Sequence, residues 1–333
     1  METWKTSWKH TCASRLARGS KTWYRFVHMA LKRVLIIGGS GFIGSHIVDA
    51  LAERAERITV IDSAKSRWKN KAAKYKIMDL RDEKLHKIFA KEKPDTVFHL
   101  AAHIHDRESI EEPVKNAEVN IIGSLNVFEA ARRYLTGRLI FASTGVVYGH
   151  QDTFPIEEEA LPRPLTPYAV SKLTGERYLN FYQNVYNLPY VALRLGNVYG
   201  PRQDTSAESG AIGIFATQLM KGEQAYINND GLTTRDYVYI DDVVRAFIIA
   251  AESDYIGVLN IGTGRETSTN SIFELTRQTV GVQAAPEYRE EIKDVVKRIA
   301  LDANKARAEL RWEPTVSVEE GVEKTVNWYR ENI

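Results

Sequence analysis

Short apolar runs alternate with segments of helical hydrophobic spacing along residues 31–200. The apolar runs span residues 33–39, 57–63, 96–102, 138–145 and 189–200. The segments with helical spacing span residues 41–54, 119–134 and 168–186. Uninterrupted apolar runs are typical of strands that are buried on both faces of a parallel sheet. The pattern therefore predicts a doubly wound α/β fold, with helices on both faces of the sheet and right-handed connections.

The alternation of predicted strands and helices breaks down after residue 196. The elements become shorter, their loops contain glycine, and residues 231–252 read as a strand that runs directly into a helix. We therefore expect a first domain over residues 31–196 and a smaller C-terminal α/β lobe over residues 197–333, some of whose segments return to the first domain. A chain of 333 residues is long enough for two such units.

Composition and charge limit the class of protein. The chain is 44% hydrophobic and 26% charged, with a net charge of +2, so neither nucleic acid nor an anionic membrane is expected as a partner. No apolar stretch approaches the roughly 20 residues that a membrane helix needs. Cys12 is the only cysteine, so an intrachain disulfide is impossible and a reducing compartment fits. We expect a soluble, cytoplasmic protein.

Residues 1–30 form a basic leader with six Lys or Arg residues and one Glu. Its composition resembles an organelle transit peptide, but Met29 directly precedes the first predicted strand. We expect a disordered extension that is dispensable or reflects a misplaced start. A targeting segment and a folded arm are the alternatives.

The first predicted strand runs into the sequence GGSGFIG, where Gly38, Gly41 and Gly44 have the spacing G-x-x-G-x-x-G. Glycines at this spacing permit a tight turn and let the backbone approach a pyrophosphate, and the helix that follows offers unpaired N–H groups to the anion. The strand before and the helix after the motif give it the context of a dinucleotide-binding turn. Phe42 and Ile43 are part of this turn and are expected to face the cofactor.

Asp62 ends the second predicted strand, 18 residues beyond Gly44. A carboxylate at this point accepts hydrogen bonds from the adenosine ribose and repels a 2′-phosphate, so we expect NAD rather than NADP. Lys65 and Arg67 lie nearby and weaken that discrimination.

Tyr168 and Lys172 are one helical turn apart in the segment PYAVSKLTGERYL. They share a helix face, so the cation can stabilise the phenolate and make it a proton acceptor. Thr144, at the end of the strand RLIFAST, can share the proton of a substrate hydroxyl, which makes the three residues a candidate catalytic triad for an alcohol or ketone. A solvated Tyr–Lys pair is the alternative for such a short motif taken alone.

Eight motifs occur in the order in which the extended short-chain dehydrogenase/reductase family has them. They are GGSGFIG, IMDLRD, HLAA, VNIIGSLN, FASTGVVYG, PYAVSK, LRLGNVYGPRQ and TTRDYVYIDDVV. The chain most closely resembles the UDP-glucose 4-epimerase-like nucleotide-sugar enzymes of that family. The resemblance covers residues 31–330 and implies a Rossmann-type fold, bound NAD and a UDP-hexose substrate.

The resemblance also implies roles for individual residues. Cofactor contacts are implied for Gly38, Gly41, Phe42, Ile43, Gly44, Asp62, Asp79, Leu80, Leu100, Ala101, Ala102, Asn120, Tyr168 and Lys172. Catalysis is implied for Thr144, Tyr168 and Lys172, and sugar-nucleotide binding for Thr144, Asn197, Arg235 and Arg298. Arg289 is a rival of Arg298, and Asp236 is an alternative partner for Arg235. The family's usual homodimer would pair the two helices that contain Asn126 and Tyr178.

The residues after Thr144 indicate the reaction. Sugar 4,6-dehydratases of this family carry an Asp-Glu pair there, and UDP-glucuronate decarboxylases carry a Glu at the second place, but this chain has Gly145 and Val146. Neither can move a proton, so we expect the 4-keto sugar to receive its hydride back on the opposite face, which is epimerisation at C4.

The sequence leaves alternatives open both for the sugar substrate and for the class of function. UDP-glucose/UDP-galactose is the expected pair, with UDP-N-acetylglucosamine or UDP-glucuronate as alternatives, because the residue at the sugar gate falls at about Ile299. An NAD(P)-dependent reductase or dehydratase of the same family and a non-enzymatic dinucleotide sensor are the other candidates. His99, His103 and His105 do not converge in this reading, so no metal site is expected.

Overall fold

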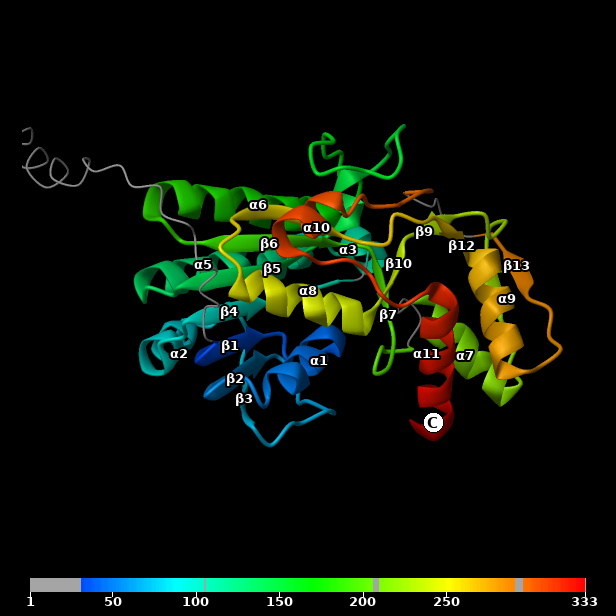
Figure 1. The fold of residues 1–333 in the computed structure, drawn as a ribbon, viewed down its shortest axis with the longest axis horizontal. Helices are drawn as coiled ribbons and strands as arrows, with labels where there is room; N and C mark the ends of the chain where they lie inside the picture. Colours follow the sequence, from blue (N-terminus) through cyan, green and yellow to red (C-terminus); the bar gives the residue numbers. More distant parts are fainter. Residues whose placement is uncertain (1–30, 105, 206–209, 291–295, 333) are drawn as a thin grey trace, which may run out of the picture.

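The computed structural model describes residues 31–104, 106–205, 210–290 and 296–332, so the basic leader and its cysteine lie outside the described residues. Its centre is a seven-stranded sheet in the order β11-β6-β5-β4-β1-β2-β3 (Figure 1). The strands are β1 (Arg33–Ile37), β2 (Arg57–Asp62), β3 (Ala73–Ile77), β4 (Thr96–His99), β5 (Arg138–Thr144), β6 (Tyr190–Leu195) and β11 (Gly257–Ile261). All neighbouring pairs are parallel, which confirms the predicted doubly wound sheet.

Helices cover both faces of this sheet (Figure 1). The helices around it are α1 (Phe42–Leu51), α2 (Lys84–Glu92), α5 (Gly123–Arg133), α6 (Pro167–Tyr186) and α8 (Ile240–Glu252). Val34 and Ile36 of β1 pack with α1 and α8 in one apolar cluster, whereas Leu35 and Ile37 pack with α2, α5 and α6 in another. Successive side chains of a strand point to opposite faces, so a strand buried on both faces must be apolar throughout.

The second lobe lies beyond one end of the sheet (Figure 1). Its helices α7 (Ala211–Lys221), α9 (Thr269–Val280) and α11 (Val318–Asn332) pack on one another. Its short strand pairs are β7 (Asn197–Tyr199) with β10 (Tyr237–Tyr239), β8 (Tyr226–Asn228) with β13 (Glu287–Arg289), and β9 (Thr234–Arg235) with β12 (Thr267–Ser268). From the same half of the chain, α8, β11 and α10 (Asn304–Leu310) return to the sheet.

The apolar run over residues 189–200 is two strands, because the chain leaves the large sheet at Gly196. Gly196 N donates to Ile261 O at 2.8 Å, and Asn197 N donates to Asp236 O at 2.6 Å. A Cβ at Gly196 would lie 2.7 Å from Asp236 O, so only glycine allows the two backbones to approach this closely. The break directs β7 into the second lobe.

The predicted helix over residues 119–134 also differs in detail. Two short helices, α3 (Asp106–Glu111) and α4 (Pro113–Ala117), lead into a π-helical turn, η1 (Glu118–Ile122), before α5 begins. β3 was not predicted, because its run AKYKI mixes lysines with apolar residues, as edge strands often do. No helix among the described residues is both long and apolar enough to cross a bilayer.

Candidate active site

Close backbone contacts shape the glycine turn after β1. Gly38 has a φ of +86°, and a Cβ there would lie 2.4 Å from Ala101 N. A Cβ at Gly44 would lie 2.2 Å from Gly38 O, so α1 packs directly against the turn. At Gly41, the residue before α1, a Cβ would meet Gly38 O at 3.5 Å and no other atom of the described chain within 4 Å. The turn thus leaves the N-terminus of α1, where Phe42 and Ile43 lie, open to a pyrophosphate.

Asp62 lies beside this turn, at the carboxyl end of β2. Its Oδ2 accepts a hydrogen bond from Ser40 N at 2.9 Å, and its Oδ1 accepts one from Ala64 N at 3.0 Å. The carboxylate is partly exposed, so it retains lone pairs for a ribose hydroxyl. This position fits the adenosine side of a dinucleotide.

The end of β4 forms the other wall of the crevice. Leu100 N and Ala101 N both donate to Ile37 O, at 2.8 and 3.0 Å, and Ala102 follows half-buried. The glycine turn, Asp62 and these residues therefore meet at the carboxyl ends of β1, β2 and β4. Doubly wound sheets bind their ligands at this edge.

Asp79 and Leu80, which the resemblance assigns to the cofactor, lie in different settings. Arg81 forms an ion pair with Asp79 at 2.7 Å, and this hydrogen-bonded guanidinium lowers the pKa of the Asp79 carboxyl. Leu80 is buried. A Cβ added at Gly123 would lie 3.1 Å from the Cβ of Leu80. Leu80 thus supplies an apolar floor, while Asp79 is held at the rim by Arg81.

Thr144 and Tyr168 face the site from adjacent elements. Thr144 ends β5, and its Oγ accepts a hydrogen bond from Val146 N at 3.4 Å at the start of the 3-10 turn η2 (Gly145–Tyr148). Tyr168 lies in the first turn of α6, which Thr166 caps by accepting from Ala169 N at 3.2 Å. The cap and the Pro at the first helical position fix where α6 begins, and therefore where the phenol lies.

Lys172 is buried one turn beyond Tyr168. Its Nζ donates to Ala142 O at 2.8 Å and lies 5.9 Å from the centre of the Tyr168 ring. Burial lowers the pKa of the amine to about 7. The structure thus places the Lys172 amine between Tyr168 and the backbone of β5 at Ala142, two residues before Thr144 on the same strand.

Asn120 lies in the π-helical turn and is also buried. Its Oδ1 accepts from His103 N at 2.7 Å, and its Nδ2 donates to His103 O at 3.0 Å and to Ser171 Oγ at 3.0 Å. The amide therefore ties the loop after β4 to the helix that carries Tyr168 and Lys172. Its contact with a cofactor would pass through these neighbours.

The histidines of HLAAHIH have separate partners. His99 Nε2 lies 2.8 Å from Ser124 Oγ inside the core, where burial lowers the pKa of the imidazole to about 3. His103 pairs with Glu108 at 2.9 Å, and His105 lies outside the described residues. Within the part of the chain that the structure describes, no group of three or more His, Cys, Asp or Glu side chains is placed to hold a metal ion.

Asn197 begins β7 and Arg235 ends β9, both in the second lobe. They are neighbours across the β7–β10 junction, where Asn197 N donates to Asp236 O at 2.6 Å. The Asp236 carboxylate is buried and accepts hydrogen bonds from Thr263 N, Thr263 Oγ, Gly264 N and Leu301 N. Asp236 therefore joins two segments, the turn after β11 and the chain at Leu301, to the base of Arg235.

Arg298 and Arg289 lie in different settings. Arg298 forms a two-bond ion pair with Glu266, at 2.9 and 2.6 Å, and stacks on Phe154 with its guanidinium 4.2 Å from the ring centre. Glu266 also accepts from Thr234 Oγ, directly beside Arg235. Arg289 lies on β13 and donates to Asn228 Oδ1 at 3.0 Å. Arg298 is thus the one linked to the neighbourhood of Arg235.

A buried ion pair that sequence reasoning missed lies under the triad. Arg194 on β6 forms two hydrogen bonds with Glu176 on α6, at 3.0 and 2.7 Å, and Ser143 Oγ donates to the same carboxylate at 2.5 Å. Arg194 also donates to Tyr148 Oη at 2.8 Å. A signal was present, because Glu176 is four residues from Lys172 and shares its helix face.

The fold and this arrangement define a dinucleotide-dependent hydride-transfer enzyme of the extended short-chain dehydrogenase/reductase type. Residues 34–262 match the model of the NAD dependent epimerase/dehydratase family, and the chain belongs to that family. The predicted resemblance and the predicted cofactor, NAD, are confirmed.

Three relatives illustrate the similarity. The chain is 38% identical to the UDP-glucose 4-epimerase of Mycolicibacterium smegmatis, over 90% of this chain and 98% of that one. The structure of the UDP-glucose 4-epimerase of Thermotoga maritima with UDP-glucose is 42% identical, with a TM-score of 0.88, over 90% and 99% of the two chains. The UDP-N-acetylglucosamine 4-epimerase of Methanobrevibacter ruminantium is 34% identical, with a TM-score of 0.86, over 92% and 100%. The protein is an NAD-dependent epimerase.

Proposed function

We propose that the protein interconverts UDP-glucose and UDP-galactose by epimerisation at C4. The observation that carries the proposal is the space beside Thr144. A Cβ at Gly145 would lie 3.1 Å from Leu301 Cδ1 and 3.3 Å from Leu195 O. A side chain at this position would press on Leu301 and on the backbone at Leu195, so the packing favours glycine where the dehydratases of the family carry an acid. The site offers the Tyr–Lys pair without an additional acid, which supports reversal of the oxidation over loss of water.

Tyr168 is the proposed base. Its phenolate takes the proton of the sugar's 4-hydroxyl, and Thr144 Oγ shares that proton during the transfer. Lys172 supports the phenolate from one turn below. NAD held along the glycine turn and Asp62 would supply the hydride acceptor and donor for C4. Tyr168 then returns the proton to the 4-keto oxygen after the sugar ring has presented its other face, so no net oxidation remains.

The sugar must turn while the nucleotide stays in place. Asn197, Arg235 and Arg298 are proposed to hold the diphosphate, because a planar guanidinium gives a phosphate two parallel hydrogen bonds. Such an anchor on the second lobe leaves the hexose free to rotate above Tyr168. The link from Arg298 through Glu266 to the strand of Arg235 supports the choice of Arg298 over Arg289.

The cofactor residues are proposed as a set. The glycine turn would hold the pyrophosphate, Asp62 the ribose, and Leu80 the adenine. Leu100, Ala101 and Ala102 would line the middle of the crevice, with Asp79 at its rim and Asn120 acting through Ser171. In this proposal residues 31–196 form the NAD domain and residues 197–333 mainly the sugar-nucleotide domain. The single cysteine of the sequence supports a reducing compartment, the cytoplasm.

A second sugar is supported by one observation. Ile299, near the expected sugar gate, is buried in an apolar cluster with Val147, Tyr148 and Leu301. An aliphatic side chain that packs inward leaves more room at the gate than an aromatic one, which suits an N-acetyl group as well. UDP-N-acetylglucosamine is therefore the second candidate substrate.

The decisive experiment is a panel of nucleotide sugars followed by NMR of the products. With UDP-galactose we expect UDP-glucose and no net NADH. Inversion of UDP-N-acetylglucosamine alone would change the substrate but keep the reaction. If no UDP-sugar of the panel, including the uronate, changes configuration at C4, the proposal is wrong.

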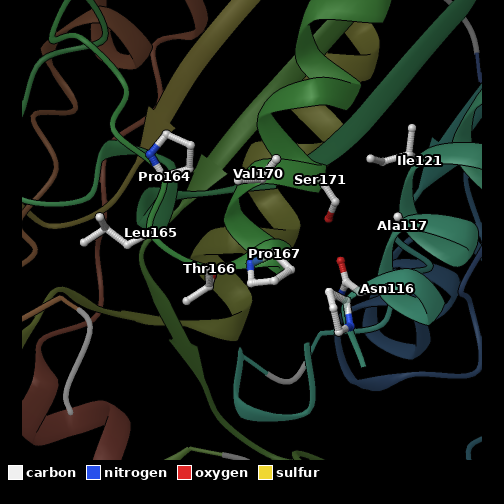
Figure 2. Close-up of a pocket in the computed structure, with 10 residues that line it drawn as sticks. Asn116, Ala117, Ile121, Pro164, Leu165, Thr166, Pro167, Val170 and Ser171 are labelled. Atoms are coloured by element: carbon white, nitrogen blue, oxygen red, sulfur yellow. The ribbon is translucent and has the colours of Figure 1, made fainter. Parts of the chain in front are cut away.

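We also propose that the protein is a homodimer. Val170, Tyr178, Phe181 and Val185 form an exposed apolar stripe along one face of α6. Beside the start of this stripe lies a groove of about 390 Å³, with Ala117 on one side and the α6 residues on the other (Figure 2). The groove is lined by Pro113, Asn116, Ala117, Ile121, Pro164, Leu165, Thr166, Pro167, Val170 and Ser171. An apolar stripe of this length beside a groove is typical of a surface that a second copy covers.

The oligomeric state tests this directly. Phe181→Glu should shift the mass measured by light scattering from dimer to monomer, because it places a charge in the centre of the stripe. Asn180→Glu, a neighbouring exposed position on another face of α6, is the matched control and should leave the mass unchanged. A monomeric mass for the unmodified protein would contradict the homodimer.

A further inference from the structure

The loop over residues 63–72 joins the cofactor crevice to the second lobe. It begins at Asp62, whose carboxylate accepts hydrogen bonds from the glycine turn at Ser40 N and from the loop itself at Ala64 N. Ser66 is buried, and its Oγ accepts from Trp68 N at 3.2 Å. The first half of the loop is thus part of the wall beside the adenosine position.

Trp68 packs against the other lobe. Its ring meets that of Trp328 on α11 edge to face, with 5.4 Å between the centroids and 64° between the planes. The guanidinium of Arg202, in the loop after β7, lies 5.3 Å from the centre of the Trp68 ring. Edge-to-face aromatic pairs and cation–π contacts each stabilise such an arrangement beyond simple burial.

The same contact is tied to the first domain through Asp49 on α1. Asp49 Oδ2 pairs with Arg202 at 2.7 Å, and Asp49 Oδ1 accepts from Asn70 Nδ2 at 2.8 Å. Arg202 has a φ of +69°, an unfavourable backbone conformation for a residue with a Cβ, which needs support from its surroundings. One carboxylate therefore fixes both the loop and the arginine that covers Trp68.

The second half of the loop has polar supports and many charges. Asn70 N donates to Tyr75 Oη at 3.0 Å, and Lys69 Nζ lies 5.9 Å from the centre of the Tyr75 ring. Lys65, Arg67, Lys69 and Lys71 are exposed, and four like charges within seven residues repel one another. The apolar anchor among these cations is Trp68, half-buried between them. The contacts of Trp68 with Arg202 and Trp328 are therefore the support that the second lobe gives the loop, in addition to the polar contacts of Asn70 with the first domain.

We propose that Trp68 is a positioning residue for the adenosine half of NAD, acting as a latch that the second lobe holds. Packing of Trp68 between Arg202 and Trp328 keeps the loop over residues 63–72 against the crevice and slows the release of NAD. The inference rests on the proposed function, in which NAD stays bound through every turnover. Because Trp328 and Arg202 come from the C-terminal half, separation of the lobes would also loosen the cofactor.

The test measures NAD release without any sugar nucleotide. Full-length protein is loaded with radiolabelled NAD, freed of excess by gel filtration, and chased with unlabelled NAD. Trp68→Ala should release the label on the order of tenfold faster, which is the effect expected of losing one aromatic and one cation–π contact. Trp328→Ala, on the other lobe, should do the same, and the double variant should release no faster than either single one. Trp68→Phe should largely restore slow release.

The control is Lys71→Ala, an exposed position of the same loop, which should release NAD at the unmodified rate. If Trp68→Ala and Trp328→Ala both release NAD at the unmodified rate, the proposal is wrong. This holds even if the two variants have lower melting temperatures. Faster release from Trp68→Ala alone overturns the link between the lobes. With saturating NAD added, Trp68→Ala should still epimerise UDP-galactose. If the unmodified protein does not epimerise UDP-galactose but the Trp68 and Trp328 variants still release NAD faster, the proposed function is wrong and the role of Trp68 stands.

Discussion

The amine of Lys172 lies 5.9 Å from the centre of the Tyr168 ring and donates its hydrogen bond to Ala142 O on the neighbouring strand. The backbone carbonyl fixes the amine in place beneath the phenol. Burial lowers its pKa to about 7. When it is protonated, the amine at this distance favours the phenolate form of Tyr168.

Tyr168→Phe should lower kcat for UDP-galactose by at least about a hundredfold, because the variant has no group to accept the hydroxyl proton. NAD should remain bound, since the ring and the helix are kept. Both can be measured on one sample, by coupled assay and by the absorbance of the released nucleotide. Tyr178→Phe, on the exposed face of the same helix, is the control. Full activity in Tyr168→Phe would refute the role of the phenol.

Lys172→Met should stabilise the ligand-free protein in a pH-dependent way. The ammonium has a pKa of 10.5 in the unfolded chain and about 7 in the fold. Between these values the unfolded chain holds a proton that the fold lacks, so the cost of burying the amine is complete below about pH 7 and fades toward about pH 10.5. The gain in Tm should thus be largest at neutral pH and smallest near pH 10. Thermal unfolding across this range checks it, and a gain that grows with pH would contradict it.

Asp62→Asn should weaken the discrimination between NAD and NADP. The amide keeps an acceptor for Ser40 N but loses the charge that repels a 2′-phosphate, and Lys65 and Arg67 are close along the chain to bind that phosphate. We expect the ratio of the two dissociation constants to change by about tenfold, which corresponds to about 1.4 kcal/mol. Calorimetric titration with both dinucleotides measures it. Arg67→Ala in the Asp62→Asn background should reverse the gain for NADP, and no reversal would show that the loop cations play no part.

Arg298→Ala should raise KM for UDP-glucose by about tenfold or more, as expected for loss of a charge-assisted hydrogen bond. Arg235→Ala should act in the same direction. Arg289→Ala is the matched comparison, because this arginine is held by Asn228 on a different strand. Steady-state kinetics on the three variants decides between the two C-terminal arginines. A KM that rises for Arg289→Ala and not for Arg298→Ala would reverse the assignment.

The sheet and the cofactor turn could be predicted because their signals are local. The apolar run of β1 and the glycines after it have fixed spacings, and each spacing has a direct geometric reason. Gly38 is required where the turn approaches the backbone of Ala101 after β4, and Gly44 where α1 packs on the turn at Gly38. The break of the run over residues 189–200 at Gly196 was not predictable in the same way, since its cause is the backbone of Asp236, far along the chain.

The roles of some site residues could not be decided from the sequence alone. Arg289 and Arg298 both lie in the segment after residue 285, and only the fold pairs Arg298 with Glu266. Asn120 carries an amide that fits a cofactor, but the π-helical turn directs it to His103 and Ser171. In each case the deciding partner belongs to another element, and no spacing in the sequence reveals it.

The sequence by itself determined the doubly wound fold, the dinucleotide turn and the Tyr168–Lys172 pair, because helical and strand periods place residues a few positions apart on one face. Only the tertiary structure decided the rest. Glu176 meets Arg194, and Trp68 meets Trp328, through contacts between elements that pack together from distant parts of the chain. Such contacts depend on how whole helices and strands pack, within the first domain for Glu176 and Arg194 and between the two lobes for Trp68 and Trp328, and no local spacing encodes that packing.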